Sequence, residues 1–173
     1  YDPRNPVPTI GGGISAADQV MPPGGFDQVA RKGFVGCNDT QPLIMRSDVL
    51  SFETEQLDKD TEITGSMYMH LWVSTTAKDT DFTAKLIDVF PRSSDYPDGL
   101  AINISDSIIR TRYRNGWDKP KLMKPNEIVE IVFELYPTSV IFAKFHKIRL
   151  DISSSNWPRF DVNPNTGKDL GRD

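Results

Sequence analysis

Residues 79–89 read DTDFTAKLIDV, and this segment sets the pattern for most of the chain. In an extended strand, two sets of side chains point to opposite faces: Phe82, Ala84 and Leu86 on one, and Thr83, Lys85, Ile87 and Val89 on the other. This period of two is typical of a pleated strand with one buried face. Asp79 and Asp81 stand at its start, where carboxylates can accept hydrogen bonds from loop amides. We therefore predict a sandwich strand here.

Short segments with similar alternation follow one another from residue 48 onward. We expect strands at 49–54, 62–76, 79–89, 100–105, 108–113, 127–136 and around 148–152. Short strands at even spacing are typical of an all-β sandwich or barrel, and alternation favours antiparallel sheets with one packed face each. Two layers are needed to bury those faces, so the sequence predicts an all-β fold, a jelly-roll β-sandwich.

The division of the chain follows from the same pattern. We expect a single domain over 1–173, with an irregular lead-in and long loop at 1–47, a sandwich core at 48–160 and a tail at 161–173. Residues 1–8 contain three X-Pro pairs, the run Gly11-Gly12-Gly13 follows, and residues 14–43 show no sustained periodicity. A loop this long is uncommon in a compact domain unless it has a function. We expect this loop to contact another molecule or domain.

Composition excludes some partners. The net charge of -4 argues against nucleic acid or an anionic membrane, and the basic residues Lys119, Lys121 and Lys124 are interrupted by prolines, which indicates a solvated loop. No apolar run approaches the roughly 18 residues of a membrane helix. The single cysteine, Cys37, excludes an internal disulfide and favours a cytoplasmic location, with secretion left open. Because the chain begins with Tyr1, we expect a piece of a longer polypeptide.

Serine hydrolase chemistry has no clear candidate in this chain. A nucleophile elbow requires Gly-x-Ser-x-Gly between a strand and a helix. The nearest text, around Ser15, lacks the second glycine and follows no predicted strand. Ser153 closes a strand, where we expect its hydroxyl to satisfy backbone groups. We predict no catalytic residue.

Metal sites are also weakly indicated. His70, His146 and Cys37 lack zinc-ligand spacing. We interpret His70 as a hydrogen-bonded, partly buried ring and His146 as part of an exposed turn. Six aspartates could in principle surround a calcium ion, although their spacing favours turn-forming roles: Asp79, Asp81, Asp88, Asp95, Asp98 and Asp106. We therefore predict no metal and no cofactor.

Three tryptophans offer a further alternative. Trp72 falls within a predicted strand, and Trp117 and Trp157 fall in loops. They could form a stacking platform for a sugar, but we interpret them as core and domain contacts.

Four motifs, in this order, carry a family resemblance: YDPRNPVPTIGG at 1–12, DTDFTAKLIDVFP at 79–91, DGLAI at 98–102 and SSSNWPRFDVNPNTG at 153–167. The chain resembles the C-terminal non-catalytic domain of the cocaine esterase and X-prolyl dipeptidyl peptidase family of serine hydrolases. That family also includes α-amino-acid ester hydrolases and cephalosporin acylases. The resemblance implies a galactose-binding-like jelly roll packed against an α/β-hydrolase domain of the same polypeptide, which carries the catalytic Ser, Asp and His.

The resemblance also implies details that the residues alone do not give. In the family the segment after the Gly-Gly pair leans toward the active-site cleft, and here that segment is 13–41. The family continues beyond residue 173 into another strand, so we expect one sheet edge to lack a partner.

The polar string after the last predicted strand is our candidate for a functional loop. We hypothesise that Arg159 and Asp161 pin it through charge-assisted hydrogen bonds, which hold Trp157 and Phe160 in the interior or at the interface with the catalytic domain. The alternative is an ordinary solvated turn.

We expect a domain that is inert alone and belongs to a serine hydrolase acting on esters, amides or X-Pro peptides, where it caps the cleft, fixes substrate size and supports contacts in a homo-oligomer. Two alternatives remain: a stand-alone carbohydrate-binding module, and an independent esterase built on Ser15 or Ser153.

Overall fold

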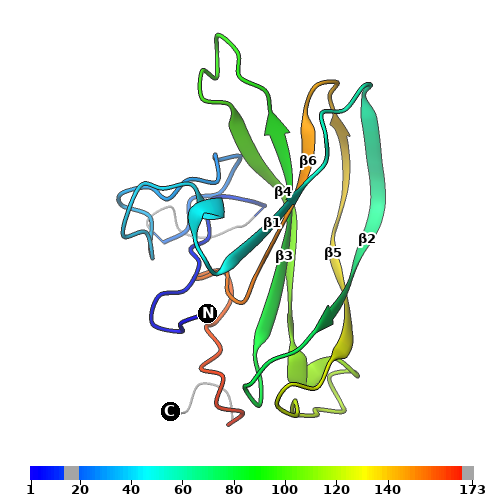
Figure 1. Ribbon diagram of the computed structural model, residues 1–173. Helices are drawn as coiled ribbons and strands as arrows, with labels where there is room; N and C mark the ends of the chain where they lie inside the picture. The colour runs from blue at the N-terminus through cyan, green and yellow to red at the C-terminus, as the bar shows by residue number, and fades with distance from the viewer. Residues whose placement is uncertain (14–19, 169–173) are drawn as a thin grey trace.

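The computed structural model describes residues 1–13 and 20–168, and Figure 1 shows the arrangement of their elements. In chain order these are η1 (Leu43–Met45), β1 (Val49–Glu53), β2 (Thr61–Val73), β3 (Asp81–Phe90), β4 (Leu100–Arg110), η2 (Thr111–Tyr113), β5 (Val129–Phe142) and β6 (Lys147–Ser153). Among the described residues, no helix has the length and apolar character that a membrane span requires.

The strands form two sheets that face each other. One sheet has the order β1-β6-β3-β4, and the other pairs β2 with β5; all pairings are antiparallel. The first strand thus lies beside the last and the second beside the last but one, which is the wrapping of a jelly roll, here with six strands in the described residues. The prediction of an all-β sandwich is confirmed.

The hydrophobic core lies between the two sheets. Its buried members are Ala84, Leu86, Ile131, Phe133, Leu135 and Phe142. In β5 the predicted alternation holds, because Ile131, Phe133 and Leu135 are buried whereas Glu130 and Glu134 face solvent. This strand runs on to Phe142, six residues beyond the expected end.

The prediction of two separate strands in the region of β4 is wrong. Residues 100–105 and 108–113 were expected to be separate strands, but a single strand runs from Leu100 to Arg110. The polar run at 105–107 resembles a break in sequence, yet Asp106 is buried and paired across the sheet with Lys85. The strand ends before η2 because the side chain of Asp79 accepts hydrogen bonds from Thr111 Oγ1 and the backbone N–H of Arg112.

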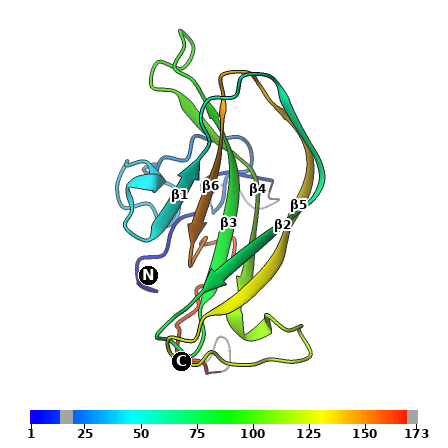
Figure 2. The same ribbon diagram turned by 45° about the vertical axis from the view of Figure 1, so that its right-hand side comes forward.

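The strand β3 departs from the prediction of one buried face. Thr83, Lys85 and Ile87 are as buried as the core residues on the opposite side. Figures 1 and 2 show the reason: the lead-in covers the face of the four-stranded sheet that points away from β2 and β5. The lead-in forms an apolar cluster in which Val7, Ile10, Ala30 and Leu43 pack with Val49 of β1. The central sheet is therefore covered on both sides.

Candidate functional site

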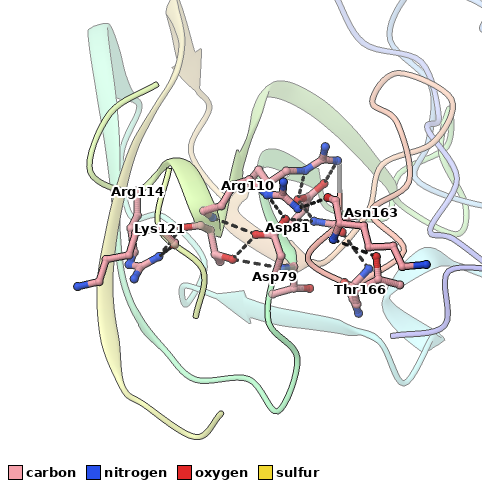
Figure 3. Close-up of polar contacts among 12 residues, drawn as sticks. Asp79, Asp81, Arg110, Arg114, Lys121, Asn163 and Thr166 are labelled. Carbon is pink, nitrogen blue, oxygen red and sulfur yellow. Dashed lines mark hydrogen bonds and ion pairs between the residues drawn. The ribbon is translucent and has the colours of Figure 1, made fainter. Parts of the chain in front are cut away.

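The aspartates at the start of β3 form the centre of a buried polar cluster, drawn in Figure 3. Asp81 accepts two hydrogen bonds from Arg110, from Nε at 2.7 Å and from Nη2 at 2.8 Å. Asp79 accepts one from Arg112 Nε at 2.7 Å. Both carboxylates are almost fully buried, and such charges are stable in the interior only when they are paired and hydrogen-bonded. Each aspartate thus has its own arginine.

Asn163 joins this cluster to the C-terminal tail. Its side-chain amide donates to Asp81 at 2.7 Å and to Asp79 at 3.1 Å, while its Oδ1 accepts from the backbone N–H of Asn165. Arg112 also donates to the backbone carbonyl of Lys168. We call Asp79, Asp81, Arg110, Arg112 and Asn163 the tail clamp, because together they fasten the tail to β3 and β4.

In the tail clamp, burial and hydrogen bonding have opposite effects on the pKa of Asp81. Burial raises the pKa of Asp81, whereas the hydrogen bonds from Arg110 and Asn163 act in the opposite direction. The hydrogen bond to Asp81 in turn raises the pKa of Arg110. Losing either partner would leave a buried charge without compensation.

A second cluster holds the loop after β6. Arg159 Nη1 lies 2.7 Å from Asp106 Oδ1, and the amide of Asn156 donates to Asp106 Oδ2 at 2.9 Å. Thr9 Oγ1 donates to Asn156 Oδ1 at 2.9 Å. We call Thr9, Asp106, Asn156 and Arg159 the loop anchor. It ties the loop and the lead-in to the same buried carboxylate on β4.

Backbone pairing strengthens this connection. The lead-in runs beside residues 155–157, where Thr9 N donates to the carbonyl of Trp157 at 2.7 Å and Trp157 N donates to that of Val7 at 2.9 Å. Pro8 and Trp157 form a parallel bridge. The lead-in and the loop after β6 are therefore hydrogen-bonded to each other beside the sheet.

A buried lysine lies next to the loop anchor. Lys85 on β3 is opposite Asp106 of β4 and Asp151 of β6, and it is 3% exposed. Burial lowers its pKa from 10.5 to about 8, although both aspartates act to raise it. The sequence did not predict this buried alignment of Asp106, Lys85 and Asp151, because a lysine in an alternating strand indicates a solvent-exposed face.

Arg159 and Asp161, which were predicted to act together on the loop after β6, lie in different surroundings. Arg159 forms the buried contact with Asp106, whereas Asp161 is exposed and acts on Arg110 only through its charge. Trp157 and Phe160 are half-buried, and Arg159 lies over the ring of Phe160 at 5.4 Å. The geometry brings Arg159 together with Thr9, Asp106 and Asn156, which were not predicted to act with it.

The histidines differ from expectation. His146 is not in an exposed turn: its ring is 13% exposed and its Nδ1 lies 2.8 Å from Asp88, whose pKa is raised by burial. The reason is that the turn between β5 and β6 folds the ring against Phe90, with centroids 4.2 Å apart. His70 is hydrogen-bonded to Glu130 as expected, but it is 56% exposed rather than partly buried.

Among the described residues, the serine and histidine side chains considered for catalysis have other partners, and the aspartates considered for metal binding do not gather into one group. Ser153 donates to the backbone carbonyl of Ser155, the structural role expected for it, and Ser15 lies outside the described residues. Neither histidine is hydrogen-bonded to a serine in the described ranges. Of the six aspartates, Asp95 and Asp98 are exposed and the other four are buried. The residues that the structure describes contain no group of three or more His, Cys, Asp or Glu able to hold a metal.

The structure corrects the expected role of one tryptophan and leaves the expected domain contacts of the loop tryptophans as a prediction. Trp72 is not a core residue: it lies on the outer face of β2 and is 69% exposed. Trp117 is more exposed still, at 81%, in the turns after η2.

Taken together, these features define a β-sandwich module in which buried ion pairs fasten loops and tail to the sheets. The chain belongs to the family of X-Pro dipeptidyl-peptidase C-terminal non-catalytic domains, whose family model matches residues 14–172. The resemblance to cocaine esterase and its relatives, predicted from four motifs, is thereby confirmed.

Comparison with known proteins gives the same result. The chain is 40% identical over 173 residues to cocaine esterase of Rhodococcus sp. (strain MB1 Bresler), covering all of this chain and 27% of that protein. A putative serine esterase of Mycobacterium bovis is 27% identical over 133 residues, covering 67% of this chain and 20% of the esterase.

Solved structures agree on the fold. An α-amino acid ester hydrolase matches with a TM-score of 0.77 and 30% identity, covering 96% of this chain and 26% of that one. An aminopeptidase from the marine sediment archaeon Thaumarchaeota archaeon matches with a TM-score of 0.76 and 29% identity, covering 97% and 27%. The chain thus spans about a quarter of the length of these structural relatives.

Proposed function

We propose that this domain packs against the catalytic domain of a serine hydrolase and helps to shape its substrate cleft. The observation that carries the proposal is the anchored lead-in: a long irregular segment is held on one face of the sheet by the loop anchor and by its own apolar cluster. A segment fixed in this way can present its exposed residues in one position to a neighbouring domain. We further propose that the domain takes part in contacts between copies of the enzyme.

The membership of the family supports this proposal. The relatives named above are an esterase, an ester hydrolase and an aminopeptidase, and each is several times longer than this chain. An ester or amide substrate, including an X-Pro peptide, is accordingly proposed for the complete polypeptide.

The loop that follows Gly13 offers a direct test. Val20 is 46% exposed and lies at the beginning of the described part of that loop. In the complete polypeptide, Val20→Asp is expected to raise KM for an ester with a bulky acyl group severalfold, with little change in kcat, because it alters the wall of the cleft rather than the reacting groups. Steady-state kinetics with a series of acyl groups measures this.

Trp72→Asp is the matched control, because Trp72 is also exposed but lies on β2, on the side of the sandwich opposite the lead-in. The proposal fails if both variants keep the KM values of the parent for every acyl group, or if both change them equally.

Arg159→Ala tests the role of the loop anchor. The change removes the guanidinium paired with Asp106, a carboxylate that is 2% exposed and keeps its hydrogen bond from Asn156, so the free energy of unfolding is expected to fall by about 2 kcal/mol. Urea unfolding of the chain measures the loss. Arg92→Ala, at an exposed position beyond β3, is the control and should unfold like the parent.

The loop anchor should matter for activity as well. In the complete polypeptide, Arg159→Ala is expected to raise KM more than it changes kcat, while Arg159→Lys restores part of the loss by keeping a charge near Asp106. An Arg159→Ala variant with unchanged stability and unchanged kinetics would show that this loop is an ordinary solvated turn.

A further inference from the structure

A small recess lies beside the tail clamp, next to η2 and the turns that follow it. Its volume is about 180 Å³. Its walls are formed by Ile108, Tyr113, Trp117 and Phe160, and its polar groups belong to Asp81, Arg110 and Asp161. This aromatic recess brings together residues from the start of β3, from β4, from η2 and the turns after it, and from the loop after β6.

The aromatic wall has an open ring face. Trp117 packs against Tyr113 with ring centroids 4.8 Å apart and an angle of 36° between the planes. The Trp117 side chain is nevertheless 81% exposed, the highest value among the large hydrophobic residues described as exposed. An indole held by one neighbour and open on its other side is suited to stacking against a flat, partly apolar ligand.

The polar groups of the recess include both donors and acceptors. Arg110 uses Nε and Nη2 for its two bonds to Asp81, so its remaining N–H groups are able to donate elsewhere. Asp161 is exposed, and its carboxylate can accept hydrogen bonds. An anion would meet two carboxylates in this recess, and a cation would meet the guanidinium of Arg110. A neutral ligand that both donates and accepts fits these groups best.

We propose that the aromatic recess binds a single neutral sugar ring. The apolar face of a pyranose stacks on Trp117, one hydroxyl donates to Asp161, and a neighbouring hydroxyl accepts from Arg110. A pocket with apolar walls and a few converging polar groups is the usual form of a small-molecule site. This binding activity would be separate from the cleft-shaping role proposed above and does not depend on it.

Titration of the 173-residue chain with methyl hexopyranosides tests the proposal. The indole N–H resonance of Trp117, identified by its absence in Trp117→Ala, is expected to shift and saturate with at least one glycoside. Trp117→Ala and Asp161→Asn should each weaken that binding about tenfold, the upper range for an aromatic contact of this kind. Both side chains are exposed, so both variants should keep the melting temperature of the parent.

Trp72→Ala is the matched control, because it removes another exposed indole, on the outer face of β2, and should leave the affinity unchanged. Failure of every glycoside to move the Trp117 resonance would overturn the proposal, as would binding that Trp117→Ala leaves intact. A shift produced only by an alkylguanidinium or alkylammonium probe would also overturn it and would assign the recess to a basic side chain of a partner protein. None of these outcomes bears on the Val20→Asp kinetics.

Discussion

Asp79→Ala is expected to lower the free energy of unfolding by about 3–5 kcal/mol, the usual cost of removing one partner from a buried ion pair. The loss is large because Arg112, 9% exposed, would keep its charge without the carboxylate, and because Thr111, Asn163 and the Arg112 backbone N–H would lose an acceptor. Urea unfolding followed by circular dichroism measures the change, and expression as insoluble protein would be consistent with it.

Two further variants keep this prediction testable. Asp98→Ala removes an exposed carboxylate from the hairpin between β3 and β4 and should cost little. Asn163→Ala leaves both aspartate–arginine pairs and the contact of Arg112 with Lys168 in place, and removes only the hydrogen bonds from Asn163 to Asp79 and Asp81. An intermediate loss of about 1–3 kcal/mol is therefore expected. If Asp79→Ala and Asp98→Ala unfold at the same urea concentration, the tail clamp does not stabilise the domain.

Stability should rise with pH between about 8 and 10 because of Lys85. Burial lowers the pKa of this lysine from 10.5 to about 8 in the folded chain, so within this window the folded state binds fewer protons than the unfolded state. The free energy of unfolding therefore increases as the pH rises. A shift of this size corresponds to about 3 kcal/mol when the whole window from folded to unfolded pKa is crossed.

Tyr1 limits the range over which the effect can be measured. Its pKa is raised to about 12, mainly by burial, so above pH 10 the unfolded state loses this proton first and stability falls. Urea unfolding at several pH values from 7.5 to 10 should show a positive slope for the parent and a flatter line for Lys85→Met, which cannot titrate. Parallel lines for the two proteins would mean that Lys85 is solvated in the folded chain.

The strands whose outer faces meet water could be predicted from the sequence. In β5 the glutamates alternate with Ile131, Phe133 and Leu135, and this pattern needs no knowledge of distant residues. The second face of β3 could not be predicted in the same way. Lys85 and Thr83 look like solvent-facing residues until the lead-in covers them, and the carboxylate partners of Lys85 lie on β4 and β6. Local periodicity reports the polarity of a face, not what covers it.

The candidate site shows the same limit. Arg159 could be found because it lies in a dense polar string after a core strand, but its partner Asp106 looked like a turn residue or an ion ligand. Asn163 belonged to the same string, although nothing in the sequence connects it with Asp79 and Asp81 more than eighty residues earlier. Asp161 was grouped with Arg159 by proximity alone, and the two side chains face different surroundings.

The contact between Thr9 and Asn156 joins residues 147 positions apart. During synthesis on a ribosome, the lead-in emerges before the rest of this domain, and its hydrogen bonds to Asn156 and Trp157 cannot form until almost the whole domain has followed. Val7 and Ile10 can pack early against the other members of their apolar cluster, but the backbone beside them lacks its partners from the loop after β6 throughout that delay. Closure that depends on contacts so distant in sequence slows folding, so the lead-in is expected to be the last part of the sandwich to become fixed.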